Sequence, residues 1–378
     1  MSENVYQIDF NKPESVHFIG IGGISMSGLA EILLDEGFTV SGSDSHRSEL
    51  TDNLEARGAK IYIGQRAENI QDGIDVVVYT AAIHPDNPEF QEVKRRGIPM
   101  LTRAELLGEM MRNYKNAIAI AGTHGKTTTT SMVTEIFLQA KNDPTISVGG
   151  ILPAIGGNIR VGGPEFFVTE ACEYTNSFLS FYQDLADIRH SFKLFAERVP
   201  AQGAVVINGD IENYQEIIEA VKGKVITFGH SRGNDYSAGD IQYDAYAHPS
   251  FDLYIGGEKK ERLTLGVAGE HNVYNALAAI AVSLENGISM DAIRAGLAHF
   301  TGTNRRFEKK GEVNGFTIID DYAHHPHEIE ATLKTAQNYP HKTLWCIFQP
   351  HTYTRTKAFL PQFAEALALA DTVILADI

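Results

Sequence analysis

Residues able to bind phosphate are concentrated between positions 122 and 128, where a glycine-rich segment runs into a lysine and a series of threonines. In a loop of this kind, backbone N–H groups and the N-terminus of the following helix face the phosphates of a nucleoside triphosphate. The lysine reaches the terminal phosphates, and the hydroxyl that follows it holds Mg²⁺. The segment therefore predicts a site for ATP and Mg²⁺, made by Gly122, Thr123, His124, Gly125, Lys126, Thr127 and Thr128.

The elements on either side of this loop support the prediction. Residues 117–121 are an apolar run of strand length, and residues 131–138 have the pattern of a helix. The loop departs from the usual spacing, because Ile120 stands where the first glycine of the pattern is expected. An ordinary glycine-rich turn before a helix is the alternative, and the flanking strand and helix make it the weaker one.

A second glycine-rich turn occurs near the N-terminus. Residues 16–19 read as a strand that leads into the glycine-rich segment 20–28, a turn that admits close approach of a pyrophosphate. Asp44 ends the next predicted strand, residues 38–44, where a Rossmann domain binds a ribose. A nicotinamide cofactor and a UDP-sugar would both use these devices, so the turn alone does not choose between them.

Thr80 ends another predicted apolar strand, residues 76–80, and His84 follows it. Loops at the carboxyl ends of parallel strands are where ligands bind in such folds, so both residues are candidates. A solvated loop histidine is an equally good interpretation of His84.

The middle of the chain offers a carboxylate and two amides. Residues 166–170 look like a buried strand, and Glu173 just after it is either an oxygen ligand for Mg²⁺ or a solvated side chain. Residues 145–150 and 154–158 are glycine-dense and are predicted to be loops. Asn272 and Asn275 fall on one face of the first turn of a predicted helix and could read a base edge, whereas helix capping would explain only one of them.

Two further predicted strands end in polar clusters. Residues 316–320 lead to Asp321 and to the pair His324 and His325, and residues 344–348 lead to His351 and Arg355. Arginine and histidine can orient a carboxylate, so the clusters predict a substrate pocket. Zinc is not expected, because adjacent histidines point in different directions and no third ligand has suitable spacing.

Bulk composition excludes several classes of protein. A chain of 378 residues is expected to form two or three domains, and 43% hydrophobic with 21% charged residues is ordinary for a globular enzyme. A formal net charge of −16 argues against nucleic acid or an anionic membrane as partner. Two cysteines indicate neither a disulfide framework nor a thiolate cluster. Without a signal peptide or membrane-spanning run, a cytoplasmic location is expected, while the oligomeric state stays open.

Taken together, seven segments resemble the Mur ligase family, and within it the members that add L-alanine to UDP-N-acetylmuramate. They are GIGGISMSGLA, AGTHGKTTTT, EACEYTNSF, GEHNVYNALAA, RRFEKKG, DDYAHHP and QPHTYTRT. The resemblance implies a step of peptidoglycan synthesis, and hence of cell-wall biogenesis, cell shape and cell division. In it, ATP converts the sugar-linked carboxylate to an acyl phosphate, which the amine of L-alanine attacks to form an amide.

The resemblance also implies an α/β fold of three domains. Residues 1–113 would be a Rossmann-like domain for the UDP-sugar, residues 114–302 a central P-loop ATPase-like domain, and residues 303–378 part of a Rossmann-like C-terminal domain. Lys126 and Thr127 would hold phosphates and Mg²⁺, with Glu173 as a second metal ligand. Asn272 and Asn275 would bind adenine, Arg306 phosphate and Asp321 ribose. His324, His351 and Arg355 would belong to motifs that face the substrates. Together with Lys126, His351 and Arg355 are the candidates for catalytic residues. The UDP-sugar site would include Gly22, Gly23, Ser25, Asp44, Thr80 and His84.

Two departures from the family pattern predict weak turnover. After Phe181, a core strand and its metal-binding histidine are missing, which would unpair neighbouring strands and open a cavity. The chain also ends at a predicted strand, where the family's third domain continues. We therefore expect little or no ligase activity from this chain.

Three alternatives remain open at this point. A murein-tripeptide recycling ligase would act on the same UDP-sugar, although the segment 20–30 is more similar to the alanine-adding enzymes. An inactive remnant could still bind the UDP-sugar. A nicotinamide oxidoreductase is the least favoured, because it leaves the phosphate loop unexplained.

Overall fold

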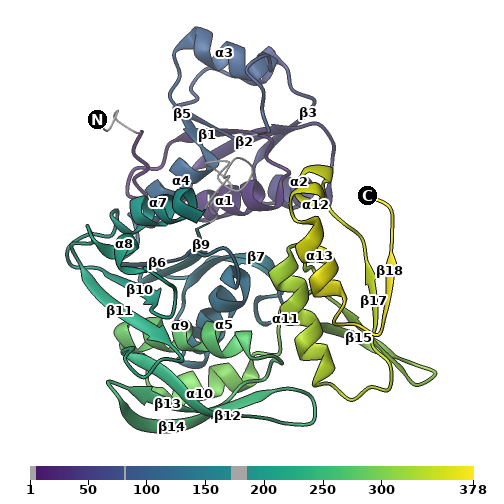
Figure 1. Ribbon diagram of the computed structural model, residues 1–378. Helices are drawn as coiled ribbons and strands as arrows, with labels where there is room; N and C mark the ends of the chain where they lie inside the picture. The colour runs from purple at the N-terminus through teal and green to yellow at the C-terminus, as the bar shows by residue number, and fades with distance from the viewer. Residues whose placement is uncertain (1–5, 81, 172–184) are drawn as a thin grey trace. The chain divides into compact units, whose positions relative to one another are not determined.

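The computed structural model describes residues 6–80, 82–171 and 185–378 (Figure 1). Its contacts group the chain into two units. Unit 1 comprises residues 1–119, 143–149 and 158–180, and unit 2 comprises residues 120–142, 150–157 and 181–378. The fold is α/β as predicted, whereas the boundaries expected at residues 113 and 302 stay predictions.

A parallel five-stranded sheet organises the first part of unit 1. Its strand order is β3-β2-β1-β4-β5, and helices connect successive strands. Parallel neighbours need such crossovers, which explains the alternation of apolar strands and amphipathic helices in the sequence. The strands predicted around residues 16–19, 38–44 and 76–80 are confirmed. The elements are β1 (Ser15–Ile19), α1 (Ile24–Asp35), β2 (Thr39–Asp44), α2 (Glu49–Ala56), β3 (Lys60–Ile63), η1 (Ala67–Asn69), β4 (Val76–Tyr79), α3 (Pro88–Arg96), β5 (Met100–Thr102) and α4 (Arg103–Met111).

A four-stranded sheet has the order β6-β9-β7-β8. Its strands are β6 (Asn116–Ile120), β9 (Phe166–Glu170), β7 (Thr145–Leu152) and β8 (Gly157–Arg160), with η2 (Pro153–Ile155) between the last two in sequence. The prediction of loops at 145–150 and 154–158 is therefore wrong for most of these residues. Gly149 lies within β7, where a Cβ would be only 2.7 Å from the Glu170 carboxylate, so this glycine marks a close approach rather than a loop.

A five-stranded sheet of order β10-β11-β12-β13-β14 lies within unit 2. In the same unit, α5 contacts both α9 and α10. Gly296 of α10 permits this close packing, since a Cβ at that position would lie 2.6 Å from the Ile136 Cα of α5. The elements are α5 (Lys126–Gln139), α7 (Leu185–Ala196), β10 (Ala204–Asn208), α8 (Gln215–Ile218), β11 (Lys224–Gly229), β12 (Tyr236–Tyr243), β13 (Pro249–Ile255), β14 (Glu258–Thr264), α9 (His271–Glu285) and α10 (Met290–His299).

Strands β6 and β10 each lie at the edge of their sheet in the described part of the chain. Both sequences, NAIAI and AVVIN, are apolar, yet every residue in them is at least partly exposed. Apolar strands of parallel sheets are normally covered on both sides, so two such edges are what loss of an interior strand would leave. The segment predicted to lack that strand includes residues 181–184, which lie outside the described residues.

The last part of unit 2 contains an antiparallel pair, β15 with β16, and a parallel pair, β17 with β18. A small core forms between helices α11 and α13 and strand β17, with Ile329, Leu333, Phe348 and Phe363 as its larger members. The predicted strands at 316–320 and 344–348 are confirmed. The elements are β15 (Glu308–Val313), β16 (Phe316–Asp320), α11 (Pro326–Gln337), β17 (Trp345–Phe348), α12 (Tyr353–Ala358), α13 (Leu360–Leu367) and β18 (Thr372–Leu375).

Candidate ATP site and N-terminal glycine turn

The phosphate loop, residues 121–125, connects strand β6 to helix α5, which begins at Lys126. Gly125 is the N-cap of α5, with φ of 77°, and its carbonyl accepts a hydrogen bond of 2.8 Å from the Thr129 N–H. Within the described residues, no side chain caps this helix and its first turn carries no acidic residue. No acceptor among the described residues binds the N–H groups of Thr127 and Thr128, so these two donors are available to an anion, which the helix dipole also favours.

Two features of Gly125 require glycine. Its φ lies in the left-handed region, and a Cβ would lie 2.3 Å from the Asn275 Oδ1. Lys126 Nζ donates a hydrogen bond of 2.5 Å to the Gly122 carbonyl, so the ammonium folds back over the loop. The lysine thus bonds back to its own loop, and the neighbouring amide leaves no room for a side chain at position 125.

The threonines of the loop differ in exposure. Thr123 is exposed, whereas Thr127 and Thr128 are partly buried in the first turn of α5. The Thr127 methyl lies 3.2 Å from the position of a Cβ on Gly150, so a glycine leaves room for this side chain. Hydroxyl oxygen is a ligand that Mg²⁺ accepts, and Thr127 offers one at the turn expected to meet the phosphates. The other predicted metal ligand, Glu173, lies outside the described residues.

Asn272 and Asn275 form a polar connection between α9 and α5. The Asn272 Nδ2 donates to the Ala268 carbonyl at 2.7 Å, and its Oδ1 accepts from the Asn275 Nδ2 at 2.9 Å. The Thr129 hydroxyl donates to the Asn275 Oδ1 at 3.3 Å. The two amides therefore lie together beside the phosphate loop, while their reading of a base stays a prediction.

Glu328 joins the phosphate loop to the start of α11, and sequence reasoning missed it. Its carboxylate accepts from the His124 Nδ1 at 3.2 Å and from the His324 N–H at 3.1 Å, and Arg306 lies 4.0 Å away. Burial alone would raise the pKa of Glu328, but these hydrogen bonds and the nearby histidines lower it to about 2. A clue was present in the sequence, because Glu328 follows the N-cap His325 by three residues and completes a capping box.

Asp321 stabilises the turn that carries Arg306. Its carboxylate accepts the N–H groups of Phe307 at 2.8 Å and Ala323 at 2.7 Å. Burial raises the pKa of Asp321, and these two hydrogen bonds oppose that shift. The role of Asp321 as a ribose ligand is untested, but its structural role in this turn is clear.

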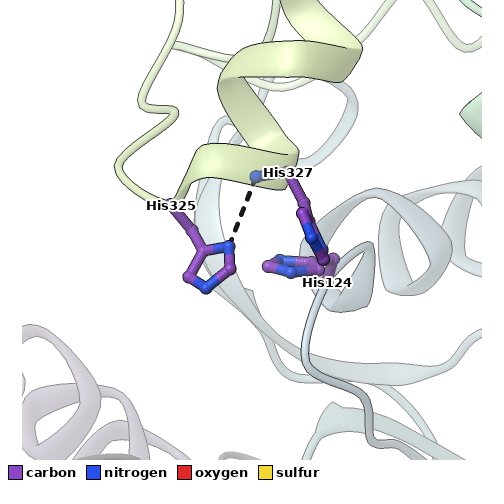
Figure 2. Close-up of side chains that lie close together, drawn as sticks. All are labelled: His124, His325 and His327. Atoms are coloured by element: carbon purple, nitrogen blue, oxygen red, sulfur yellow. Dashed lines mark hydrogen bonds between the residues drawn. The ribbon is translucent and has the colours of Figure 1, made fainter. Parts of the chain in front are cut away.

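Three histidines gather beside the loop. His325 and His327 belong to the start of α11 and His124 to the phosphate loop, and one nitrogen of each lies within 4.8 Å of the others (Figure 2). The adjacent pair His324 and His325 does not come together, as expected, but the premise that no further ligand has suitable spacing is wrong, because His124 and His327 lie beside His325. The missing ligand is supplied by a segment about 200 residues away in sequence. His324 instead faces the Tyr322 carbonyl, with its Nδ1 at 2.9 Å from that oxygen.

His351 and Arg355 lie near the end of strand β17. His351 is exposed in the loop after it, and Arg355 is partly buried in α12. The positive charge of Arg355 contributes, after burial and the two other histidines, to lowering the pKa of His325 to about 4. Arg355 is therefore close to the start of α11.

The backbone of the N-terminal glycine turn of unit 1 contacts Asp44. The Gly22 N–H donates to the Asp44 Oδ2 at 2.8 Å, and Gly23 is the N-cap of α1. Ser25 is exposed in the first turn of α1 and accepts a hydrogen bond of 3.1 Å from Arg103. This places an acidic group and a helix N-terminus together, as a nucleotide site of this fold requires.

Thr80 and His84 differ in how they are held. The Thr80 Oγ1 accepts the Ala82 N–H at 3.0 Å, directly after strand β4. His84 is exposed in the turn that follows. No contact separates its binding role from that of a solvated histidine, so both interpretations of His84 stand.

Known proteins match this chain along nearly its full length. Three family models cover successive parts of the chain. They are described as Mur ligase family, catalytic domain (residues 15–115), Mur ligase middle domain (173–283) and Mur ligase, glutamate ligase domain (305–377). The UDP-N-acetylmuramate–L-alanine ligase of Lachnospira eligens is 59% identical over 99% of this chain and 85% of its own length. The chain belongs to the Mur ligase family.

Other Mur ligases agree with this assignment. The UDP-N-acetylmuramate–L-alanine ligase of Agathobacter rectalis is 57% identical over 99% of this chain and 85% of its own length. The crystal structure of UDP-N-acetylmuramate–alanine ligase from Thermotoga maritima matches with a TM-score of 0.77 and 29% identity, over 97% of this chain and 85% of that one. A murein peptide ligase from Psychrobacter arcticus matches with a TM-score of 0.74 and 26% identity, over 96% and 84%.

The alignment with the Lachnospira ligase bears on the predicted internal gap. It spans 392 positions, more than the 378 residues of this chain. The relative therefore has residues within the aligned span that this Mur ligase lacks. In the described residues, no helix is long and apolar enough to cross a membrane.

Proposed function

We propose that this chain is a ligase that uses ATP to join L-alanine to UDP-N-acetylmuramate in the cytoplasm. The observation that carries the proposal is the phosphate loop. In it, Gly125 precedes a helix whose N-terminus has no side-chain cap, and Lys126 folds back over the turn. The relatives' names support the two substrates. Membership of the Mur ligase family supports ATP as the nucleotide.

The chemistry needs an activated carboxyl group. A carboxylate oxygen of the sugar-linked acid attacks the γ-phosphorus of ATP, which releases ADP and leaves an acyl phosphate. The amine of L-alanine then attacks the carbonyl carbon, and phosphate leaves with the oxygen that came from the carboxylate. The protein acts mainly by positioning and by stabilising negative charge.

In this proposal, the phosphate loop holds the triphosphate. The N–H groups that open α5 bind phosphate oxygens, and Lys126 turns from the Gly122 carbonyl toward the terminal phosphates. The Thr127 hydroxyl and Glu173 would hold Mg²⁺, which neutralises phosphate charge when bound. Mg²⁺ commonly keeps several waters and one or two protein oxygens, so this donor set fits it.

The remaining residues receive roles as proposals. Asn272 and Asn275 would bind adenine, Arg306 phosphate and Asp321 ribose. His324, His351 and Arg355 would orient the reacting groups, and Arg355 has the charge to pair with a carboxylate. The UDP-sugar would bind to Gly22, Gly23, Ser25, Asp44, Thr80 and His84. The domains at residues 1–113, 114–302 and 303–378 are part of the same proposal.

Product formation tests this function. We expect the full chain, ATP, Mg²⁺, UDP-N-acetylmuramate and L-alanine to yield the alanyl amide, identified by mass. Lys126→Met should abolish the product while leaving the circular dichroism spectrum, and hence the fold, unchanged. Formation of the amide without ATP, or at an equal rate in Lys126→Met, would contradict the proposal.

A second candidate is the recycling ligase, which the match to the Psychrobacter murein peptide ligase favours. Supplying L-alanine and the tripeptide together distinguishes the two, because each gives an amide of different mass. We expect the alanyl product to predominate. Exclusive formation of the tripeptide product would instead assign the recycling reaction.

A further inference from the structure

Three imidazoles converge from two segments that are distant in sequence. The ring centroid of His124 lies 5.1 Å from that of His325 and 6.2 Å from that of His327, and the latter two rings are 5.2 Å apart. All three residues belong to unit 2. Figure 2 shows His325 and His327 at the first turn of α11, with His124 reaching them from the phosphate loop.

The spacing of the nitrogens suits a divalent transition metal. One nitrogen from each ring lies within 4.8 Å of the other two. Tetrahedral coordination with metal–nitrogen bonds of about 2.0–2.1 Å needs nitrogens roughly 3.3–3.4 Å apart. His124 and His327 are exposed, so rotation of their side chains can bring the nitrogens into that range without disturbing a core.

Glu328 is placed to orient one of these ligands. Its Oε1 lies 3.2 Å from the His124 Nδ1, so it can accept a hydrogen bond from a protonated Nδ1 and leave the His124 Nε2 to bind a metal. A carboxylate behind a metal-bound imidazole is a common arrangement because it fixes the ring and makes it more basic. The site therefore has both ligands and an orienting acceptor.

The hydrogen bond that His325 already makes does not prevent its ring from binding a metal. Its Nδ1 accepts the His327 N–H at 3.4 Å, which is long for a hydrogen bond of this type. Replacing that hydrogen bond by a metal–nitrogen bond therefore loses little stabilisation. The N-terminal turn of α11 keeps its other cap, since Glu328 also accepts the His325 N–H at 3.3 Å.

We propose that His124, His325 and His327 bind one divalent cation of the Zn²⁺ type, with a fourth position open to water. Imidazole nitrogens prefer Zn²⁺, Co²⁺, Ni²⁺ and Cu²⁺ to Mg²⁺, so this site is chemically distinct from the oxygen site expected at Thr127. Metal bound here connects the phosphate loop to α11. The inference depends on the three histidines alone and stands whether or not the proposed ligase reaction is observed.

Titration with Zn²⁺ alone tests the site. The full chain, prepared without a polyhistidine tag and freed of metal with a chelator, should bind one Zn²⁺ in isothermal titration calorimetry at micromolar concentration. Co²⁺ should give the visible absorption of a four-coordinate site, displaced by Zn²⁺. Absence of stoichiometric binding, or a six-coordinate Co²⁺ spectrum, would overturn the proposal.

Two variants locate the binding. His327→Gln removes an exposed ligand, and we expect a loss of Zn²⁺ affinity of at least ~10-fold, the smallest loss typical for disturbing a metal site. His341→Gln is the control, because His341 is exposed and its Nδ1 lies 2.6 Å from the Tyr339 carbonyl, outside the trio. Equal affinities in the two variants would refute the assignment. Matching thermal midpoints, which we expect, exclude unfolding as the cause.

Discussion

Replacing Gly125 by alanine should weaken the binding of ATP to the phosphate loop. A left-handed φ of 77° costs an L-residue roughly 1–2 kcal/mol. The new Cβ would also lie 2.3 Å from the Asn275 Oδ1, so Asn275 must move and lose its bonds to Asn272 and Thr129. At about 0.5–1.5 kcal/mol for each hydrogen bond, the total cost is roughly 2–5 kcal/mol.

The loop can avoid part of this cost only by changing its shape. We therefore expect Gly125→Ala to weaken ATP binding by at least ~10-fold, equivalent to about 1.4 kcal/mol, and to lower the thermal midpoint. Gly287→Ala is the matched control, because Gly287 has φ of 75° but no atom of the described chain lies within 4 Å of its Cβ position. It should lose stability without losing ATP affinity.

Calorimetric titration with ATP and thermal unfolding provide the two readouts. Adding Asn275→Ala to Gly125→Ala removes the collision but not the backbone strain, so the double variant should recover part of the stability. Wild-type ATP affinity and an unchanged midpoint in Gly125→Ala would refute the reasoning about this loop.

Three other outcomes follow from the structure. Burial raises the pKa of Tyr114 to about 12, so this tyrosine ionises at a lower pH in the unfolded chain than in the folded one. The free energy of unfolding should therefore fall between pH 10 and 12, and Tyr114→Phe should reduce this loss in denaturant titrations. Gly296→Ala should destabilise the protein by ~1–3 kcal/mol, because the new Cβ would meet the Ile136 backbone. Gly108→Ala in α4, where no described atom lies within 4 Å of the Cβ position, should stabilise the protein by ~0.5–1 kcal/mol. Equal shifts of the thermal midpoint in the two variants would contradict this. Phosphate release per enzyme should be far slower than for the Lachnospira ligase, because β6 and β10 each pair with only one strand in the described part of the chain. Equal rates would argue against that consequence.

Local patterns were sufficient for several strands and for the strand, glycine-rich turn and helix around Lys126, but not for β7 and β8. Apolar runs such as residues 166–170 and 204–208 are strands because they bury or half-bury side chains on a sheet. The loop prediction at residues 145–150 was wrong because glycine, such as Gly149, is also needed inside a strand where another side chain comes close. Single-sequence composition cannot distinguish those two uses.

The parts of the site that were missed depend on distant contacts. No spacing rule relates His124 to His325 and His327, because the packing of α11 beside the phosphate loop creates that neighbourhood. Glu328 was missed for the same reason, although its capping box is local. The three-residue spacing of Asn272 and Asn275 predicted that they share one face of α9, but neither their mutual hydrogen bond nor the contact with Thr129 was predicted.

Transfer of oxygen from the sugar-linked carboxylate to phosphate tests the central claim most directly. UDP-N-acetylmuramate labelled with ¹⁸O in its carboxyl group should release phosphate containing one ¹⁸O, in a reaction that needs ATP, L-alanine and Lys126. The incubation should be long enough for a slow enzyme to complete several turnovers. Unlabelled phosphate, or labelled phosphate formed equally by Lys126→Met, would contradict the account.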